Sequence, residues 1–191
     1  MAAVADPSEG PPPQSAGGML ITALAALVAL AALAGSLYLS IGMELKACPL
    51  CFYQRTFAMA AVAVLGLGLL LPDVRRSVLH VLALPLAVAG VAIAAFHCYL
   101  EWTGRLECPA GIFALGSAPQ QSLAIYSLLL ILVIAGLLAD RALRFADLAL
   151  AVGAVALGLL FAYGGIQSAP KTVVPDYSVP VNEDGCRKPK S

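Results

Sequence analysis

The chain has 191 residues, of which 61% are hydrophobic and only 12% are charged. Soluble domains are typically about 45–50% apolar and about 25% charged, so this composition excludes an ordinary water-soluble enzyme and a disordered chain. Eleven basic residues balance eleven acidic ones, and this balance excludes a strongly basic nucleic-acid-binding surface. An integral membrane protein is the class that remains.

Five long segments contain no charged residue, and each is long enough to cross a bilayer as a helix. A spanning helix needs about 20 apolar residues, and its backbone polar groups must bond to one another because lipid offers no partners. The sequence therefore predicts an all-α integral membrane protein. We expect helices at about 18–41, 53–71, 78–99, 121–139 and 147–167.

The segments outside these helices predict two tails and an orientation. Residues 1–17 contain several prolines and no Lys or Arg, so we expect a disordered tail before a retained first span rather than a cleaved signal peptide. Residues 168–191 predict a second flexible tail. Arg75 and Arg76 share one short loop, and the positive-inside rule places that loop in the cytoplasm. The C-terminal tail and the loops after the first and third helices then lie outside.

All five cysteines fall on this outer side of the predicted topology. They are Cys48, Cys51, Cys98, Cys108 and Cys186. Disulfides form and persist in oxidising, extracytoplasmic compartments. The shared side therefore predicts thiol–disulfide chemistry outside the cytoplasm.

Cys48-Pro-Leu-Cys51 places two thiols at the start of the second helix. A helix N-terminus favours the thiolate form of a nearby cysteine. Arg55 follows Cys51 by one helical turn and can stabilise a thiolate or an anionic ligand. The pattern predicts a redox pair without a resident metal. A structural disulfide, or a zinc site completed by other Cys or His residues, are the alternatives.

The other cysteines leave their pairing open. Cys98 and Cys108 can meet across a ten-residue loop if their Cα atoms lie within about 7 Å, either as a stabilising disulfide or as a second redox pair. Cys186 is then a free thiol, an intermolecular link or an alternative partner for Cys108. His97, at the outer end of the third helix, either bonds a quinone oxygen or is an interfacial residue.

Residues 47–55, Ala-Cys-Pro-Leu-Cys-Phe-Tyr-Gln-Arg, resemble the Cys-x-x-Cys-x-x-Gln/Glu-Arg signature of the DsbB family. Its members are membrane thiol–quinone oxidoreductases, also called disulfide bond formation protein B. The resemblance covers residues 18–140 and implies a four-helix transmembrane bundle there. Residues 141–167 are then an additional fifth C-terminal transmembrane helix. The resemblance also implies a multi-pass protein of the bacterial inner membrane with its cysteines on the periplasmic side.

The resemblance further implies an electron relay. A thioredoxin-like, DsbA-like periplasmic oxidase delivers electrons to the pair Cys98 and Cys108, which passes them to Cys48 and Cys51. The final acceptor is a membrane quinone, ubiquinone or menaquinone, from the quinone pool. By the family pattern Cys51 is the thiolate that faces the quinone. Arg55 and His97 are the implied quinone-binding residues, and membrane lipid but no nucleic acid is a partner.

Three features depart from the family pattern. The loop between Cys98 and Cys108 is shorter than usual, Cys98 directly follows His97, and a fifth span leads to a tail with Cys186.

Other classes of membrane protein would require different sequence features. An enzyme like vitamin K epoxide reductase usually carries its Cys-x-x-Cys on the last bundle helix, and a transmembrane electron conductor needs a cysteine at mid-span. A non-enzymatic membrane protein with structural disulfides or a metal site is the remaining alternative.

Overall fold

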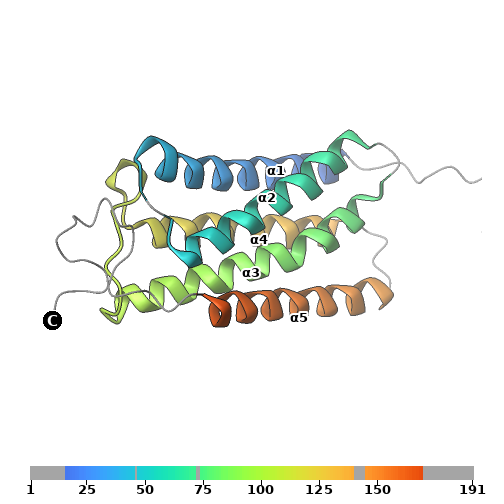
Figure 1. The fold of residues 1–191 in the computed structure, drawn as a ribbon. Helices are drawn as coiled ribbons and strands as arrows, with labels where there is room; N and C mark the ends of the chain where they lie inside the picture. Colours follow the sequence, from blue (N-terminus) through green and yellow to red (C-terminus); the bar gives the residue numbers. More distant parts are fainter. Residues whose placement is uncertain (1–15, 46, 72–73, 140–144, 170–191) are drawn as a thin grey trace, which may run out of the picture.

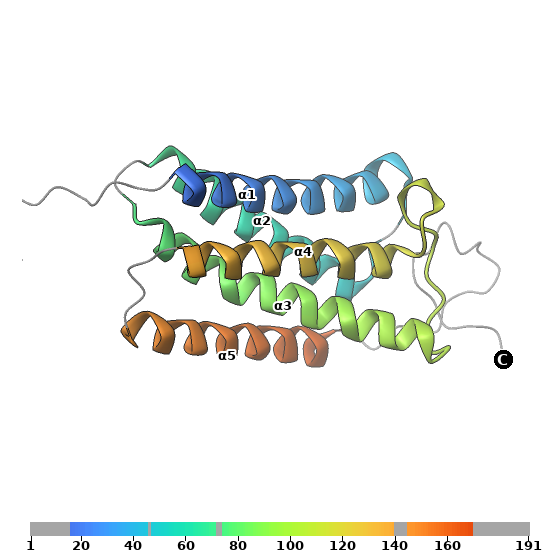
Figure 2. The ribbon, with the colours of Figure 1, turned by 180° about the vertical axis from the view of Figure 1, so that it is seen from behind.

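The computed structural model describes residues 16–45, 47–71, 74–139 and 145–169. This part of the chain forms long helices that run side by side (Figures 1 and 2). The long helices are α1 (Ala16–Leu37), α2 (Pro49–Leu70), α3 (Arg76–Trp102), α4 (Ala118–Ala139) and α5 (Phe145–Ser168). No strand occurs among the described residues, where an isolated bridge joins Ala110 to Ser117.

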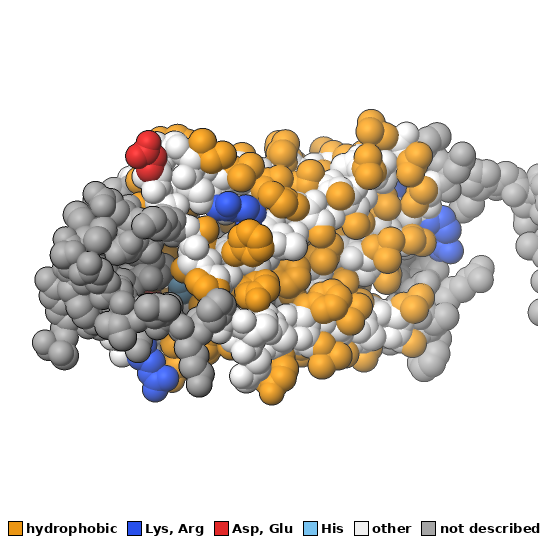
Figure 3. Space-filling view, viewed as in Figure 1, with side chains coloured by type: hydrophobic (Ala, Val, Ile, Leu, Met, Phe, Trp, Pro, Cys, Tyr) orange, Lys and Arg blue, Asp and Glu red, His pale blue; other side chains and the backbone are white. Residues whose placement is uncertain are grey.

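Each long helix has the length and composition needed to span a membrane. Large apolar side chains such as Leu20, Leu67 and Leu138 are exposed on their outer surfaces, and Figure 3 shows apolar side chains over most of one face. So much exposed apolar surface is unusual for a soluble monomer and is expected where lipid covers the protein. In the part of the chain that the structure describes, the predicted all-α class is confirmed, with five helices long and apolar enough to span a membrane.

Two helix boundaries differ from the prediction and affect the cysteines. Helix α2 begins at Pro49 rather than near residue 53, because proline is favourable in the first turn and the Cys48 sulfur caps the helix by accepting the Cys51 N–H at 3.3 Å. Helix α3 continues to Trp102 rather than ending near residue 99. Cys98 therefore lies inside a helix and not at the edge of a loop.

Helix α1 ends in an unusual turn. A π-helical segment, η1 (Tyr38–Gly42), follows Leu37 without a break. π-Helical turns are rare and frequently occur at functional sites. This turn sets the direction of the Ser40 side chain, whose contact is described below.

Helix α3 occupies the centre of the packing, and more than half of its most apolar window is buried. Small residues let its neighbours approach closely, as is common between membrane helices. A Cβ atom on Gly158 of α5 would lie only 2.6 Å from the Pro85 carbonyl oxygen of α3. At the C-terminal end of α5, Ser168 Oγ lies 2.9 Å from Tyr53 Oη of α2, and the two hydroxyls form a hydrogen bond. Helix α5 therefore packs along α3 and ends beside the start of α2 (Figure 1).

Several predictions concern residues outside the described ranges. They include the N-terminal tail up to residue 15 and, from residue 170, the C-terminal tail with Cys186. The division into a bundle at 18–140, an additional helix at 141–167 and two tails also stays a prediction.

Candidate redox site and the adjoining cavity

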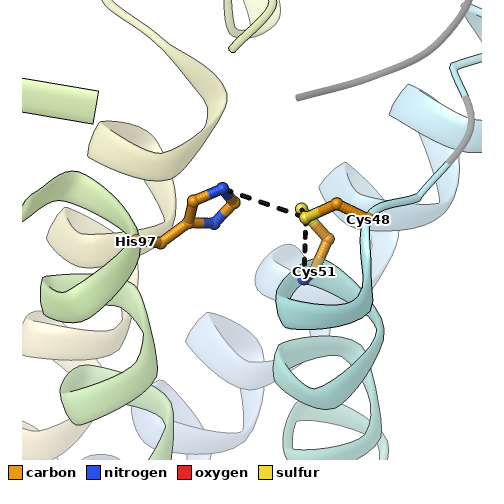
Figure 4. Close-up of side chains that lie close together, drawn as sticks. All are labelled: Cys48, Cys51 and His97. Carbon is orange, nitrogen blue, oxygen red and sulfur yellow. Dashed lines mark hydrogen bonds between the residues drawn. The ribbon is translucent and has the colours of Figure 1, made fainter. Parts of the chain in front are cut away.

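Two thiols and one imidazole meet at one end of the helices. Cys48 Sγ and Cys51 Sγ are 2.9 Å apart, and Cys48 Sγ is 3.8 Å from His97 Nε2 (Figure 4). Both thiols are free, and His97 is completely buried on α3. The site therefore holds a reduced Cys-x-x-Cys pair from α2 against a histidine from α3.

The surroundings of Cys48 favour its thiolate form. The hydrogen bond with the Cys51 thiol lowers the pKa of Cys48 most strongly, and the hydrogen bond and charge of His97 lower it further. Burial opposes both effects, but the pKa still falls from 9.0 to about 4. Because the thiolate is the nucleophile in disulfide exchange, Cys48 is the reactive member of the reduced pair. The family pattern instead places the quinone-facing thiolate on Cys51.

Arg55 is held in place by the end of α1. Its Nε donates to Ser36 Oγ at 3.0 Å, and its Nη2 donates to the Ser36 carbonyl oxygen at 2.9 Å and also to Ser40 Oγ. Neither serine was predicted as a site residue. The only signal for them in the sequence is a pair of polar residues spaced by four at the end of an apolar segment.

A cavity of about 160 Å³ lies beside the thiols, between α1, α2, α4 and the loop after α3. Cys48, Cys51 and Arg55 line it together with apolar side chains such as Leu39 and Ile125. An apolar cavity with a few polar groups is the usual form of a small-molecule site. Its position allows a ligand to reach the redox pair from the lipid-embedded part of the protein.

The structure adds Gln54 to the predicted residues of this cavity. Gln54 is only 5% exposed, and its Oε1 accepts a hydrogen bond from Ser122 Oγ at 2.9 Å. The Tyr126 hydroxyl donates to the Gln54 backbone carbonyl and so ties α4 to α2. Gln54 Nε2 is buried with no hydrogen-bond partner in the described structure, and Gln54 lines the cavity. A sequence signal existed, because a glutamine inside a membrane helix is costly and points to function.

His97 contacts the Cys48 thiol but is not among the described residues that line this cavity. Its Nε2 lies 3.5 Å from Cys108 Sγ, besides its contact with Cys48. His97 thus bridges the redox pair and the loop cysteine.

The expected pairing of Cys98 with Cys108 is not formed. Cys98 is a free thiol and completely buried, whereas Cys108 is disulfide-bonded. Cys98 is packed inside α3, whereas the loop after α3 brings Cys108 to His97. The described cysteines therefore do not include the disulfide partner of Cys108.

Comparison with known proteins gives the family of the chain. The family described as "Disulfide bond formation protein DsbB" matches residues 19–128, which are more than half of the chain. The chain belongs to the DsbB family. The match ends within α4, so α5 lies outside the part that defines the DsbB family.

Curated proteins that are similar to this chain have names that refer to disulfide formation. A "Probable disulfide formation protein" of Deinococcus radiodurans is 43% identical over 81 residues, which are 41% of this chain and 50% of the relative. "Disulfide bond formation protein B" of Burkholderia pseudomallei is 39% identical over 87 residues, 44% of this chain and 51% of the relative. "Disulfide bond formation protein C" of Bacillus subtilis is 35% identical over 91 residues, 45% of this chain and 63% of the relative. The matches thus span about half to two thirds of these relatives, and no solved structure matches the chain.

Proposed function

We propose that this protein is a membrane protein-dithiol:quinone oxidoreductase that generates disulfides for a thioredoxin-like, DsbA-like oxidase. One observation carries the proposal: the Cys48–Cys51 pair lines an apolar cavity and lies against His97, which also contacts the disulfide-bonded Cys108. Such a position suits a pair that receives electrons from a neighbouring disulfide and donates them to a ligand in the cavity. Membership of the DsbB family supports the same function.

Electrons enter, in this proposal, at the disulfide of Cys108. A thiolate of the reduced oxidase attacks that disulfide and forms a mixed disulfide, and the second oxidase thiolate resolves it, so the oxidase leaves with its own disulfide. The two freed entry thiols then exchange with the Cys48–Cys51 disulfide, so the entry disulfide re-forms and two thiols appear at Cys48 and Cys51. The described thiols correspond to this stage, with the electrons on Cys48 and Cys51 and Cys108 oxidised. His97 Nε2 contacts sulfurs of both pairs, so we assign it to proton movement during the exchange.

Electrons leave toward the cavity, which we propose as the binding site of ubiquinone or menaquinone. A bound quinone takes up two electrons and two protons. The orphaned Gln54 Nε2 fits this ligand, because a buried N–H without an acceptor is costly and a quinone carbonyl supplies one. Arg55 provides a second donor with a permanent charge. While Cys48 forms a mixed disulfide with an entry cysteine, Cys51 is the remaining sulfur of the pair at the cavity, near Arg55. The low pKa of Cys48 is therefore compatible with the family pattern, in which Cys51 faces the quinone.

We further propose that Cys108 pairs with Cys186. The sequence has five cysteines, and Cys48, Cys51 and Cys98 are free. Cys186 lies outside the described residues. Because the other three cysteines are free, Cys186 is the remaining cysteine of the chain that can pair with Cys108. The end of α5 supports the pairing, because the Tyr53–Ser168 hydrogen bond returns the chain to the redox end. In this proposal Cys98 takes no part in the relay.

The proposed location is the bacterial inner membrane with the redox end on the periplasmic side. Cys48, Cys51 and Cys108 lie at one end of the helices, and Arg75 and Arg76 begin α3 at the opposite end. This arrangement agrees with the positive-inside rule.

A reconstituted reaction tests the function. The purified protein is mixed with a reduced thioredoxin-like oxidase and a ubiquinone or menaquinone analogue, and quinone absorbance and oxidase thiols are followed together. We expect one quinone reduced for each disulfide formed. Removal of quinone should leave Cys48 and Cys51 reduced. A Cys48–Cys51 bond that stays oxidised without quinone would instead indicate a structural disulfide.

A further inference from the structure

The redox pair and His97 also have the composition of a site for a thiophilic divalent cation. Cys48 Sγ, Cys51 Sγ and a nitrogen of His97 all lie within 4.8 Å of one another. Thiolate sulfur and imidazole nitrogen are the ligands that Zn²⁺ prefers, and three protein ligands leave one tetrahedral position open. His97 is buried, so this ligand approaches the thiols from inside the protein without a competing shell of water.

A fourth sulfur lies next to this set. His97 Nε2 is 3.5 Å from Cys108 Sγ and 3.8 Å from Cys48 Sγ, so the nitrogen is flanked by sulfur on two sides. Cys108 is disulfide-bonded in this structure, and reduction of that bond frees its thiol. The fully reduced protein then presents three cysteines and one histidine, a common set for structural zinc.

We propose that the reduced protein binds Zn²⁺ through Cys48, Cys51 and His97, and that Cys108 adds a fourth ligand once its own disulfide is reduced. Each Zn–S bond forms at a thiolate, so any thiol still protonated releases its proton, and no electron is transferred. Two sulfurs bound to one tetrahedral zinc by bonds of about 2.3 Å lie about 3.8 Å apart, so metal binding moves the Cys48 and Cys51 sulfurs apart from their present separation of 2.9 Å. Formation of the Cys48–Cys51 disulfide removes two ligands, so the metal binds only the reduced state.

This site goes beyond the oxidoreductase function and beyond the expectation that the protein has no resident metal. Zn²⁺ and the electron acceptor compete for the same reduced thiols. The metal therefore traps the protein when quinone is scarce, and an abundant oxidised quinone protects it. The chemistry predicts that Zn²⁺ inhibits turnover more strongly as the quinone concentration falls.

The test measures metal binding and not activity. The full-length protein in detergent, reduced and free of quinone, is titrated with Zn²⁺ against a chromophoric chelator, and with Co²⁺ to detect thiolate-to-metal absorption bands. We expect one metal per chain, and binding at least about tenfold weaker after oxidation of the thiols. Cys48→Ser and His97→Gln each remove a proposed ligand and should weaken binding by at least about 10–100-fold, the loss that follows when only a residue supporting a ligand is changed. Cys98→Ser is the matched control, because Cys98 is a free thiol directly after His97 that lies outside the ligand group.

Equal binding by the oxidised and reduced wild-type protein would overturn the proposal without recourse to any variant. A Cys98→Ser change that weakens binding as much as Cys48→Ser would overturn it as well. Because no quinone is present, the outcome is separate from the proposed function. A protein that binds Zn²⁺ but does not reduce quinone would refute only the oxidoreductase proposal.

Discussion

The Cys48 sulfur shows how two helices tune one residue. Its own helix supplies the Cys51 thiol and the Cys51 N–H, and α3 supplies His97. These groups stabilise the thiolate at a buried position, where desolvation alone would favour the neutral thiol. The balance between them makes the reactivity of Cys48 sensitive to a change on either helix.

The lowered pKa of Cys48 predicts an unusual pH dependence. An ordinary thiol with a pKa near 9 reacts about tenfold faster for each unit of pH between 6 and 8. With a pKa of about 4, Cys48 should react at a nearly constant rate over that range and slow only as the pH falls toward 4. The thiolate likewise stabilises the folded reduced protein at neutral pH, and this contribution is lost as the pH falls through about 4.

Alkylation of the reduced protein, quantified on the Cys48 peptide by mass spectrometry, measures this profile. His97→Gln removes one cause of the shift and should move the fall in rate to higher pH. A wild-type rate that rises tenfold per unit between pH 6 and 8 would contradict the assignment of Cys48 as the thiolate.

Gln54 offers a test of the quinone cavity. Gln54→Met keeps a similar side-chain volume but removes the Nε2 donor, so the apparent KM for quinone should rise by about fivefold, the equivalent of one hydrogen bond of about 1 kcal/mol. The KM for the protein oxidase should not change. Thr56→Val is the control on the same helix. Thr56 is exposed, and its hydroxyl donates to the Phe52 carbonyl oxygen of the same helix rather than to another helix. If Gln54→Met raises the KM for the oxidase instead, Gln54 does not face the quinone.

At the scale of elements, the close contact between α3 and α5 at Pro85 depends on a small residue, Gly158. A Cβ on Gly158 would meet the Pro85 carbonyl oxygen and Val88, whereas a Cβ on Gly153 would meet nothing within 4 Å. Gly158→Ala should therefore push the helices apart and lower the free energy of unfolding by about 1–3 kcal/mol. Gly153→Ala should leave stability unchanged or raise it slightly, because alanine favours the helix.

Thermal unfolding of both variants in detergent compares these effects. Equal midpoints for the two variants would show that α5 does not pack on α3 as described. The comparison also bears on function, because displacement of α5 would disturb the Tyr53–Ser168 bond at the redox end.

For the whole molecule, the state of the cysteines predicts which of them the relay needs. Cys98 is buried and free and Cys108 is disulfide-bonded, so Cys98→Ser should keep nearly full activity. Cys186→Ser should lose oxidase-driven quinone reduction by at least about 100-fold, since the entry disulfide would be missing. The same variant should still reduce quinone when a small dithiol such as dithiothreitol reduces Cys48 and Cys51 directly.

Non-reducing peptide mapping provides the independent readout for this prediction. It should recover Cys108 linked to Cys186 and Cys98 unlinked. Full activity of Cys186→Ser with the oxidase, together with a Cys98–Cys108 peptide, would restore the pairing that the sequence alone suggested.

Local spacing in the sequence was enough to predict several features. The five membrane helices follow from the length of the charge-free segments, because the bilayer demands a minimum apolar length whatever the helices contact. The Cys-x-x-Cys pair and Arg55 follow from helical periodicity, which places them within two turns of one helix. Each of these features depends on residues that are close together in the chain.

The tertiary structure alone decided which distant residues meet. His97 contacts both Cys48 and Cys108 and does not line the cavity, because α3 brings it against the start of α2 and the loop that follows α3. Gln54 became a candidate ligand-binding residue only when the structure placed it on the cavity, with its oxygen bonded to Ser122 of α4 and its buried nitrogen without a partner among the described residues. Cys98 is buried and free in α3 while Cys108 is disulfide-bonded beside His97, and this difference depends on helix packing and on the path of the loop rather than on apolar length. Such contacts join residues that are up to tens of positions apart in the sequence. Their free energy comes from the packing of whole helices, and a local sequence pattern does not predict how helices pack.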